Sequence, residues 1–233
     1  MADRRIDHYP SLMSLAVHEF RTPASVVAGY LRMLQRDTTQ PLTERQRKMI
    51  EEAGNSCARL VGIIAELSDI AKLDAGSITL ARHPFDVFTL LGDVAAHVHE
   101  AEDREVKLVM RGPGDGAPIQ GDATRLKHAF DAVFRAILRE KAGPATVVAE
   151  RRLETREAPA AAVVIIADES SVQTAYETAA GVFDERRGGL GLALPLARRV
   201  FEGHGGRIWS PAPRQDDDPL TRGSAIISLP VTE

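Results

Sequence analysis

The chain has 233 residues, 44% of them hydrophobic and 27% charged, which is ordinary for one or two globular domains. Its formal net charge of −4 at pH 7 argues against a surface built for general nucleic-acid or membrane binding. The single cysteine, Cys57, excludes an intrachain disulfide framework and a multi-cysteine metal site, and we expect a small buried hydrophobe there. No stretch approaches the roughly 20 apolar residues that span a bilayer, and the N-terminal residues hold no apolar signal-peptide core, so we expect a cytoplasmic protein.

Two amphipathic helices are predicted at the start of the sequence. From about Ser11 to Arg36 most apolar residues follow helical spacing, and the polar, proline-containing segment Asp37–Thr43 then predicts a connector. A second helix is expected to begin near Thr43, which can cap it together with Gln46 as in a capping box. It should end near Gly76, because glycine readily takes a left-handed terminal conformation.

Two long amphipathic helices joined by a short loop predict an antiparallel hairpin. Each helix has an apolar stripe too long for one partner helix to cover. We therefore expect a homodimer in which two hairpins form a four-helix bundle. The alternative is a hairpin that packs only on the following region of its own chain.

From Ser77 onward, short strands alternate with helices, which is typical of an α+β fold with helices on one face of a sheet. The candidate strands are Ile78–Ala81, Val106–Met110, Thr146–Arg151, Ala162–Ala167, Arg207–Ser210 and Ala225–Leu229. The candidate helices are Val87–Glu102, Ala123–Glu140 and Leu192–Glu202. The segment Pro211–Arg222, which contains three consecutive aspartates, is expected to be a solvated surface loop.

The segment from His18 to Pro23 reads His-Glu-Phe-Arg-Thr-Pro and combines groups suited to phosphoryl chemistry. A lone helical histidine is usually structural, but Glu19 could hold the imidazole through one ring nitrogen and make the other more nucleophilic. Thr22 lies four residues after His18 and so shares its helix face. Pro23 removes a backbone donor and is expected to bend the helix where a partner must approach.

This motif, followed by a helix, a loop and another helix, resembles the dimerisation and phosphoacceptor domain of sensor histidine kinases of two-component systems. The resemblance implies that His18 carries a phosphoryl group, that Glu19 acts as a general base, and that Thr22 orients water in a reverse, phosphatase reaction. It also implies a response-regulator receiver domain as partner, whose aspartate exchanges the phosphoryl group with His18. Residues 1–76 would form this domain.

Residues 77–233 resemble the catalytic, ATP-binding domain of the same kinases. Glycines before a helix let backbone amides approach phosphate oxygens, although a plain glycine-rich turn is the alternative. Joined to the His-Gly-Gly-Arg-Ile that begins at His204, the glycine segment resembles the second glycine box of that domain. Its candidate nucleotide-binding residues are Gly188, Gly189, Leu190, Gly191 and Leu192.

One further landmark is placed as in those kinases, and several depart from their pattern. Asp168, at the end of a predicted strand, matches the aspartate that recognises the adenine amino group. Ser170 and Val172 stand where glycines are expected, and Arg187 replaces the first glycine of the second box.

Ala132 and Ala136 replace two asparagines that help hold magnesium in the resembled kinases. Alanine offers no oxygen, and magnesium demands near-ideal oxygen coordination. We therefore expect a heavily reduced affinity for ATP and Mg²⁺, the cofactors that the resemblance implies, and assign no residue to a metal. Arg135 or Arg139 could contact phosphate directly or be solvated helix residues.

Three hypotheses follow. The first is a histidine kinase with an atypical pocket that autophosphorylates His18 with ATP. The second is a histidine phosphotransferase whose second domain is vestigial and whose phosphate comes from a receiver aspartate. The third is a non-catalytic protein that binds a response regulator or a kinase. The residues favour the broad assignment to the histidine kinase family, with ATP use left open.

Overall fold

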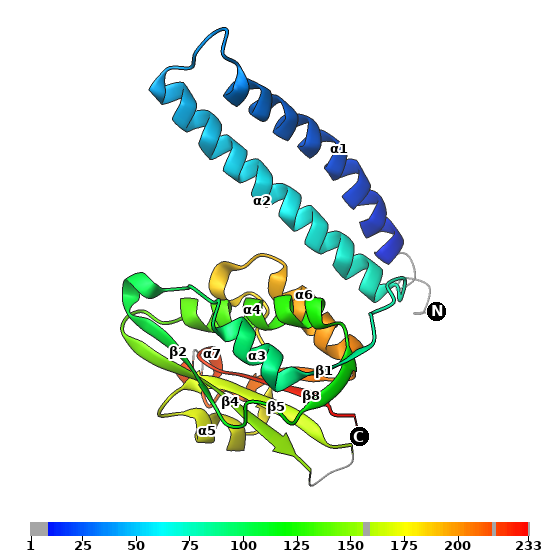
Figure 1. Cartoon of the computed structure of the whole chain (residues 1–233), viewed down its shortest axis with the longest axis vertical. Coiled ribbons are helices and arrows are strands. Elements are labelled where there is room, and N and C mark those ends of the chain that lie inside the picture. The colour runs from blue at the N-terminus through cyan, green and yellow to red at the C-terminus, as the bar shows by residue number, and fades with distance from the viewer. Residues whose placement is uncertain (1–8, 156–158, 216–217, 233) are drawn as a thin grey trace. The chain divides into compact units, whose positions relative to one another are not determined.

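The computed structural model describes residues 9–155, 159–215 and 218–232 (Figure 1). The chain forms two compact units, Met1–Ile78 and Thr79–Glu233, which are described in turn. Among the described residues, none of the helices combines the length and the apolar character needed to cross a bilayer.

The first unit is a helical hairpin of α1 (Tyr9–Arg36) and α2 (Glu44–Asp74). Thr43 caps α2 as predicted: its hydroxyl accepts the Gln46 N–H at 3.3 Å, and its own N–H donates to Gln46 Oε1 at 2.9 Å. At the other end Gly76 has a φ of 61°, and its N–H donates to the Leu73 carbonyl. Both predicted limits of this helix are confirmed.

The inner face of the hairpin is small and apolar. Val17 and Ala24 from α1 pack with Ile64 and Leu67 from α2. Cys57 is buried, as predicted, and its Sγ lies 3.4 Å from the Ala24 carbonyl oxygen, to which the thiol can donate. These residues fix which side of α1 faces α2.

The second unit contains a six-stranded sheet with the order β2-β4-β5-β8-β7-β6. Only the β2–β4 pair is parallel, and the other pairs are antiparallel. A separate antiparallel pair joins β1 to β3. The strands are β1 (His83–Asp86), β2 (Val106–Arg111), β3 (Pro118–Gly121), β4 (Ala145–Glu154), β5 (Ala161–Asp168), β6 (Ala180–Gly181), β7 (Arg207–Pro211) and β8 (Ala225–Pro230).

Three helices, α3 (Val87–Ala95), α4 (Ala123–Arg139) and α6 (Ala193–Gly203), lie on one face of the sheet (Figure 1). Their aromatic residues form the centre of this layer. The rings of Phe130 in α4 and Phe201 in α6 are 5.0 Å apart, and both side chains are fully buried. Burial of such side chains stabilises the layer by about 2 kcal/mol each.

The opposite face of the sheet is covered by the short helix α5 (Val172–Glu177) (Figure 1). Val172 and Ala175 pack there against Val163 and Ile165 of β5, which alternate with residues that face the other layer. The prediction of helices on one sheet face alone therefore needs correction. Short helices such as α5 carry too few residues to show a helical period.

Two predicted elements differ from the structure. Ile78–Ala81 is not a strand, because the Ala81 N–H reaches the Asp122 carboxylate rather than a neighbouring strand. The helix predicted for Val87–Glu102 ends at Ala95, and the chain then reaches Ala101 with a φ of 59°, which a continuous helix cannot contain.

The predicted surface loop Pro211–Arg222 is also more ordered than expected. Its residues 216 and 217 lie outside the described ranges, and Pro219–Arg222 form the short helix α7. The Asp218 side chain is buried and accepts the N–H groups of Arg214 and Leu220, each at 3.0 Å. Asp218 is therefore a cap that fixes the turn.

Candidate functional site

His18 lies on the outer face of α1. The side chain is 76% exposed, and its Nδ1 is 3.3 Å from Glu19 Oε1. Val17, the preceding residue, is buried in the hairpin, so the helical period turns His18 outward. If Nδ1 carries the proton and donates it to Glu19, the lone pair of Nε2 is free for a reacting group.

The other predicted residues of the motif share this exposed stretch. Thr22 is exposed one helical turn after His18, as the predicted spacing requires. α1 continues through Pro23, which has no N–H to donate to the Glu19 carbonyl. The structure thus brings His18, Glu19 and Thr22 to one accessible surface.

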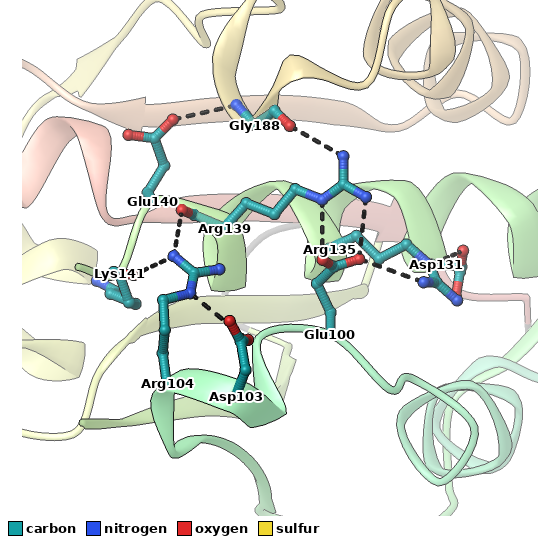
Figure 2. Close-up of polar contacts among 9 residues, drawn as sticks. All are labelled: Glu100, Asp103, Arg104, Asp131, Arg135, Arg139, Glu140, Lys141 and Gly188. Atoms are coloured by element: carbon teal, nitrogen blue, oxygen red, sulfur yellow. Dashed lines mark hydrogen bonds and ion pairs between the residues drawn. The ribbon is translucent and has the colours of Figure 1, made fainter. Parts of the chain in front are cut away.

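The glycine segment forms a short turn, η3 (Arg187–Gly189), before α6. Gly188, Gly189 and Gly191 have φ values of 68°, 61° and 66°, a left-handed backbone that favours glycine. The Gly188 N–H donates to Glu140 Oε1 at 3.1 Å, and its carbonyl accepts from Arg139 at 3.2 Å (Figure 2). The backbone N–H and carbonyl of Gly188 are therefore both bound by side chains at the C-terminal end of α4.

Asp168, the predicted adenine-binding residue, is paired with a cation. Its Oδ1 is 2.7 Å from Lys141 Nζ, and the Lys141 side chain is only 10% exposed. A Cβ on Gly223 would lie 2.7 Å from the same ammonium, so this glycine leaves the space that Lys141 fills. A cavity of about 590 Å³ borders the pair and is also lined by Glu140 and Arg222.

Arg135 and Arg139, for which phosphate contact and a solvated helix position were both left open, have carboxylate partners (Figure 2). Glu100 receives two contacts from Arg139, Nε to Oε1 at 3.0 Å and Nη2 to Oε2 at 3.2 Å. Arg135 contacts Glu100 at 3.3 Å and Asp131 at 2.8 Å. The hydrogen bond from Arg139, followed by the other contacts to both arginines, lowers the pKa of Glu100 despite its burial.

Arg187 was identified from the sequence as a departure, but its role was not. The side chain is buried, and Nε and both Nη atoms donate to Ser210 Oγ and to four backbone carbonyls. Its guanidinium also stacks 4.6 Å from the centre of the Phe183 ring. Burial lowers the pKa of Arg187, although a guanidinium keeps its charge. Arg187 therefore fixes the chain just before the glycine segment.

The two positions that carry magnesium-binding asparagines in the resembled kinases do not fit magnesium in this chain. Ala132 and Ala136 are buried in α4 and offer no oxygen ligand. Within the described ranges, no cluster of three or more histidine, cysteine, aspartate or glutamate side chains could hold a metal. Val172, where a glycine was expected, is a core residue on the opposite face of the sheet.

Comparison with known proteins identifies the first unit. Residues 11–76 match the family model for the His Kinase A (phospho-acceptor) domain. The chain is 30% identical over 208 residues to the sensor histidine kinase GacS of Pseudomonas protegens, an alignment that covers 82% of this chain and 22% of GacS. The chain thus spans about a fifth of the length of that relative.

Solved structures share both units. Full-length ShkA, solved in complex with AMPPNP, matches with a TM-score of 0.69 at 20% identity, over 96% of this chain and 46% of ShkA. The histidine kinase ThkA, solved in complex with the response regulator TrrA, matches with a TM-score of 0.56 at 17% identity, over 98% of this chain and 64% of ThkA. The predicted fold class, a helical hairpin followed by a sheet unit like that of histidine kinases, is confirmed. Residues 11–76 thus match the His Kinase A (phospho-acceptor) domain, and over 208 residues the chain is similar in sequence to a sensor histidine kinase.

Proposed function

We propose that the protein carries a phosphoryl group on His18 and exchanges it with the aspartate of a response-regulator receiver domain. The observation that carries this proposal is the accessible His18–Glu19 pair within the His Kinase A domain. GacS, a sensor histidine kinase, supports it by sequence similarity. ThkA, which was solved with a response regulator, supports the choice of partner.

The geometry of the pair defines the chemistry. Glu19 holds the Nδ1–H of His18, so the Nε2 lone pair attacks the phosphorus of a phosphoaspartate. The P–N bond forms as the P–O bond breaks, and the electron pair of the broken bond stays on the aspartate carboxylate. The Nδ1 proton passes to Glu19 or to water, and the reverse step returns the phosphoryl group. In this proposal Thr22 orients the attacking water in the phosphatase reaction.

The proposal includes a homodimer through the hairpin. Large apolar side chains on both helices remain exposed, and a second hairpin would cover them. They are Tyr9, Leu12, Leu15, Phe20, Val26, Val27, Tyr30, Met33, Leu34, Met49, Leu60 and Val61. It also includes a cytoplasmic location, as expected from the sequence.

The identity of the phosphoryl donor is independent of the identity of the phosphoacceptor. ShkA was solved with AMPPNP, and GacS is named a kinase, so ATP is the donor that these relatives suggest. Ala132 and Ala136 offer no oxygen ligand for magnesium, and the proposed exchange takes its phosphoryl group from a phosphoaspartate, so none of its steps depends on the nucleotide.

Labelling of the purified protein with ³²P-phosphoramidate, a chemical donor to histidine, tests the proposal. Wild type should acquire acid-labile, alkali-stable phosphate, and His18→Ala should not. His128→Ala is the matched control, because His128 is also an exposed histidine on a long helix. The labelled protein is then mixed with each receiver domain encoded in the same genome, and at least one should take the label. Equal labelling of His18→Ala and wild type would refute the proposal.

A further inference from the structure

The last residue of α4 and the two residues that follow it hold both segments that border the expected nucleotide site, and Figure 2 shows the contacts of Arg139 and Glu140 with Gly188. Arg139 and Glu140 bind the carbonyl and the N–H of Gly188, and Lys141 pairs with Asp168. We call Arg139, Glu140 and Lys141 the α4 clamp. In the α4 clamp, side chains of the protein bind the glycine segment and Asp168, the groups that a nucleotide would be expected to contact.

The backbone itself closes the space beneath the glycine segment. A Cβ added to Gly188 would lie 2.7 Å from the Ala136 Cα and 3.2 Å from its carbonyl oxygen. Ala136 is fully buried under this contact. A larger side chain at position 136, such as the asparagine of the family pattern, has no room unless the glycine segment moves.

The charges around the clamp are already balanced. Glu100 contacts both Arg139 and Arg135, Asp131 supplies the second negative charge at Arg135, and Glu140 lies 3.5 Å from Arg222. A triphosphate placed between the glycine segment and Arg139 would lie close to the carboxylates of Glu100 and Glu140. It would have to displace Glu100 from its bidentate contact with Arg139, one of the stronger contacts available to a guanidinium.

The chain segments after Asp168 and before Gly188 are both held by contacts outside the expected nucleotide site. After Asp168 it crosses to the opposite sheet face, where Val172 is buried in the core. Before Gly188 it is anchored by Arg187, four of whose five hydrogen bonds reach β7, α7 and Ser224, the residue before β8. Opening the site for a nucleotide would therefore disturb both anchors.

From these contacts we infer that the α4 clamp engages the glycine segment and Asp168 in place of a nucleotide, with the cavity of about 590 Å³ beside Asp168 left open, and that the second unit does not bind Mg·ATP. Taken with the proposed function, on which this consequence rests, the phosphoryl group of His18 comes from the phosphoaspartate of a receiver domain. The exchange then follows the bond changes already given for Nε2 and the aspartate carboxylate, and it needs no nucleotide.

Two measurements on the full chain test the inference. The first is calorimetric titration with millimolar Mg·ATP, with ShkA as the positive control. The second is labelling of wild type and His18→Ala with γ-³²P-ATP and magnesium, in parallel with ³²P-phosphoramidate. We expect no heat of binding, no label from ATP and a His18-dependent label from phosphoramidate.

The outcomes separate the inference from the proposed function. Saturable binding of Mg·ATP, or a label from ATP that is lost in His18→Ala, overturns the inference and leaves the proposed function standing. Absence of ATP binding together with absence of His18 labelling from either donor refutes the proposed function and supports the inference that the second unit does not bind Mg·ATP.

Discussion

Lys141 Nζ lies 2.7 Å from Asp168 Oδ1, so the carboxylate that matches the adenine-binding aspartate of histidine kinases already holds a cation. The ammonium is largely buried, whereas the carboxylate is 44% exposed. The pair joins the end of α4 to the end of β5. Its contribution to stability can therefore be measured without touching the phosphoacceptor.

Lys141→Met should lower the free energy of unfolding by about 1 kcal/mol, because it leaves the carboxylate without its cation while solvent screens part of the loss. Urea denaturation of Lys141→Met, Asp168→Asn and the double variant gives the coupling energy. Lys127→Met, at an exposed position of α4, is the control and should change stability little. Strict additivity of the two single variants would show that the pair contributes nothing.

Gly188→Ala and Gly189→Ala form a matched pair. Both glycines have left-handed φ values, but a Cβ at Gly189 would meet nothing within 4 Å, whereas one at Gly188 would collide with Ala136. We expect a loss of about 1 kcal/mol for Gly189→Ala from the backbone alone. The additional collision should bring Gly188→Ala to about 3 kcal/mol. Equal losses in urea denaturation would show that the glycine segment does not rest on α4.

Arg187→Lys tests the anchor before the glycine segment. Lysine keeps the charge but cannot reach the five acceptors that the buried guanidinium satisfies, so we expect a loss of about 3 kcal/mol or more. Arg186→Lys, at the exposed neighbouring position, should stay within about 0.5 kcal/mol of wild type. The midpoints of thermal unfolding compare the two variants, and similar midpoints would contradict the role given to Arg187.

His204 should make stability depend on pH. Its Nε2 accepts the Asp122 N–H at 2.9 Å, and burial lowers its pKa below the ordinary value of 6.5. Below pH 6.5 the unfolded chain therefore binds a proton that the folded chain refuses, and stability falls as the pH falls towards the folded pKa. The contribution approaches about 1.4 kcal/mol per pH unit.

Urea denaturation between about pH 7.5 and pH 5.5 checks this sign. His204→Gln should lose this part of the pH dependence, whatever its overall stability. His97→Gln, at an exposed position, should retain it. An unchanged pH slope in His204→Gln would assign the dependence to other groups.

The sequence predicted the local features of the fold well. The limits of α2 depend on neighbouring residues, Thr43 with Gln46 at one end and Gly76 at the other, and both are confirmed. The short strand β3 was missed because it pairs with β1, which lies far from it in the chain, and the helix α5 was missed because its six residues are too few to show a helical period. Ile78–Ala81 has the composition of a strand but no partner in the sheet.

In the candidate site too, residues close together in the sequence were predicted and contacts between distant segments were not. His18, Glu19 and Thr22 lie within five residues on one helix, so their spacing alone placed them together. The α4 clamp was not predicted, because it depends on contacts between α4 and segments some 25 to 50 residues away. Arg187 was noticed only as a missing glycine, since a single sequence does not show that its guanidinium is buried among backbone carbonyls.

The location of the phosphoryl group tests most directly whether His18 is the phosphoacceptor. The phosphoramidate-treated protein is digested at neutral or alkaline pH, and tandem mass spectrometry identifies the modified peptide. We expect modification of the α1 peptide at His18, with His128 unmodified. A phosphoryl group found at His128 or another residue, with His18 free, would contradict it.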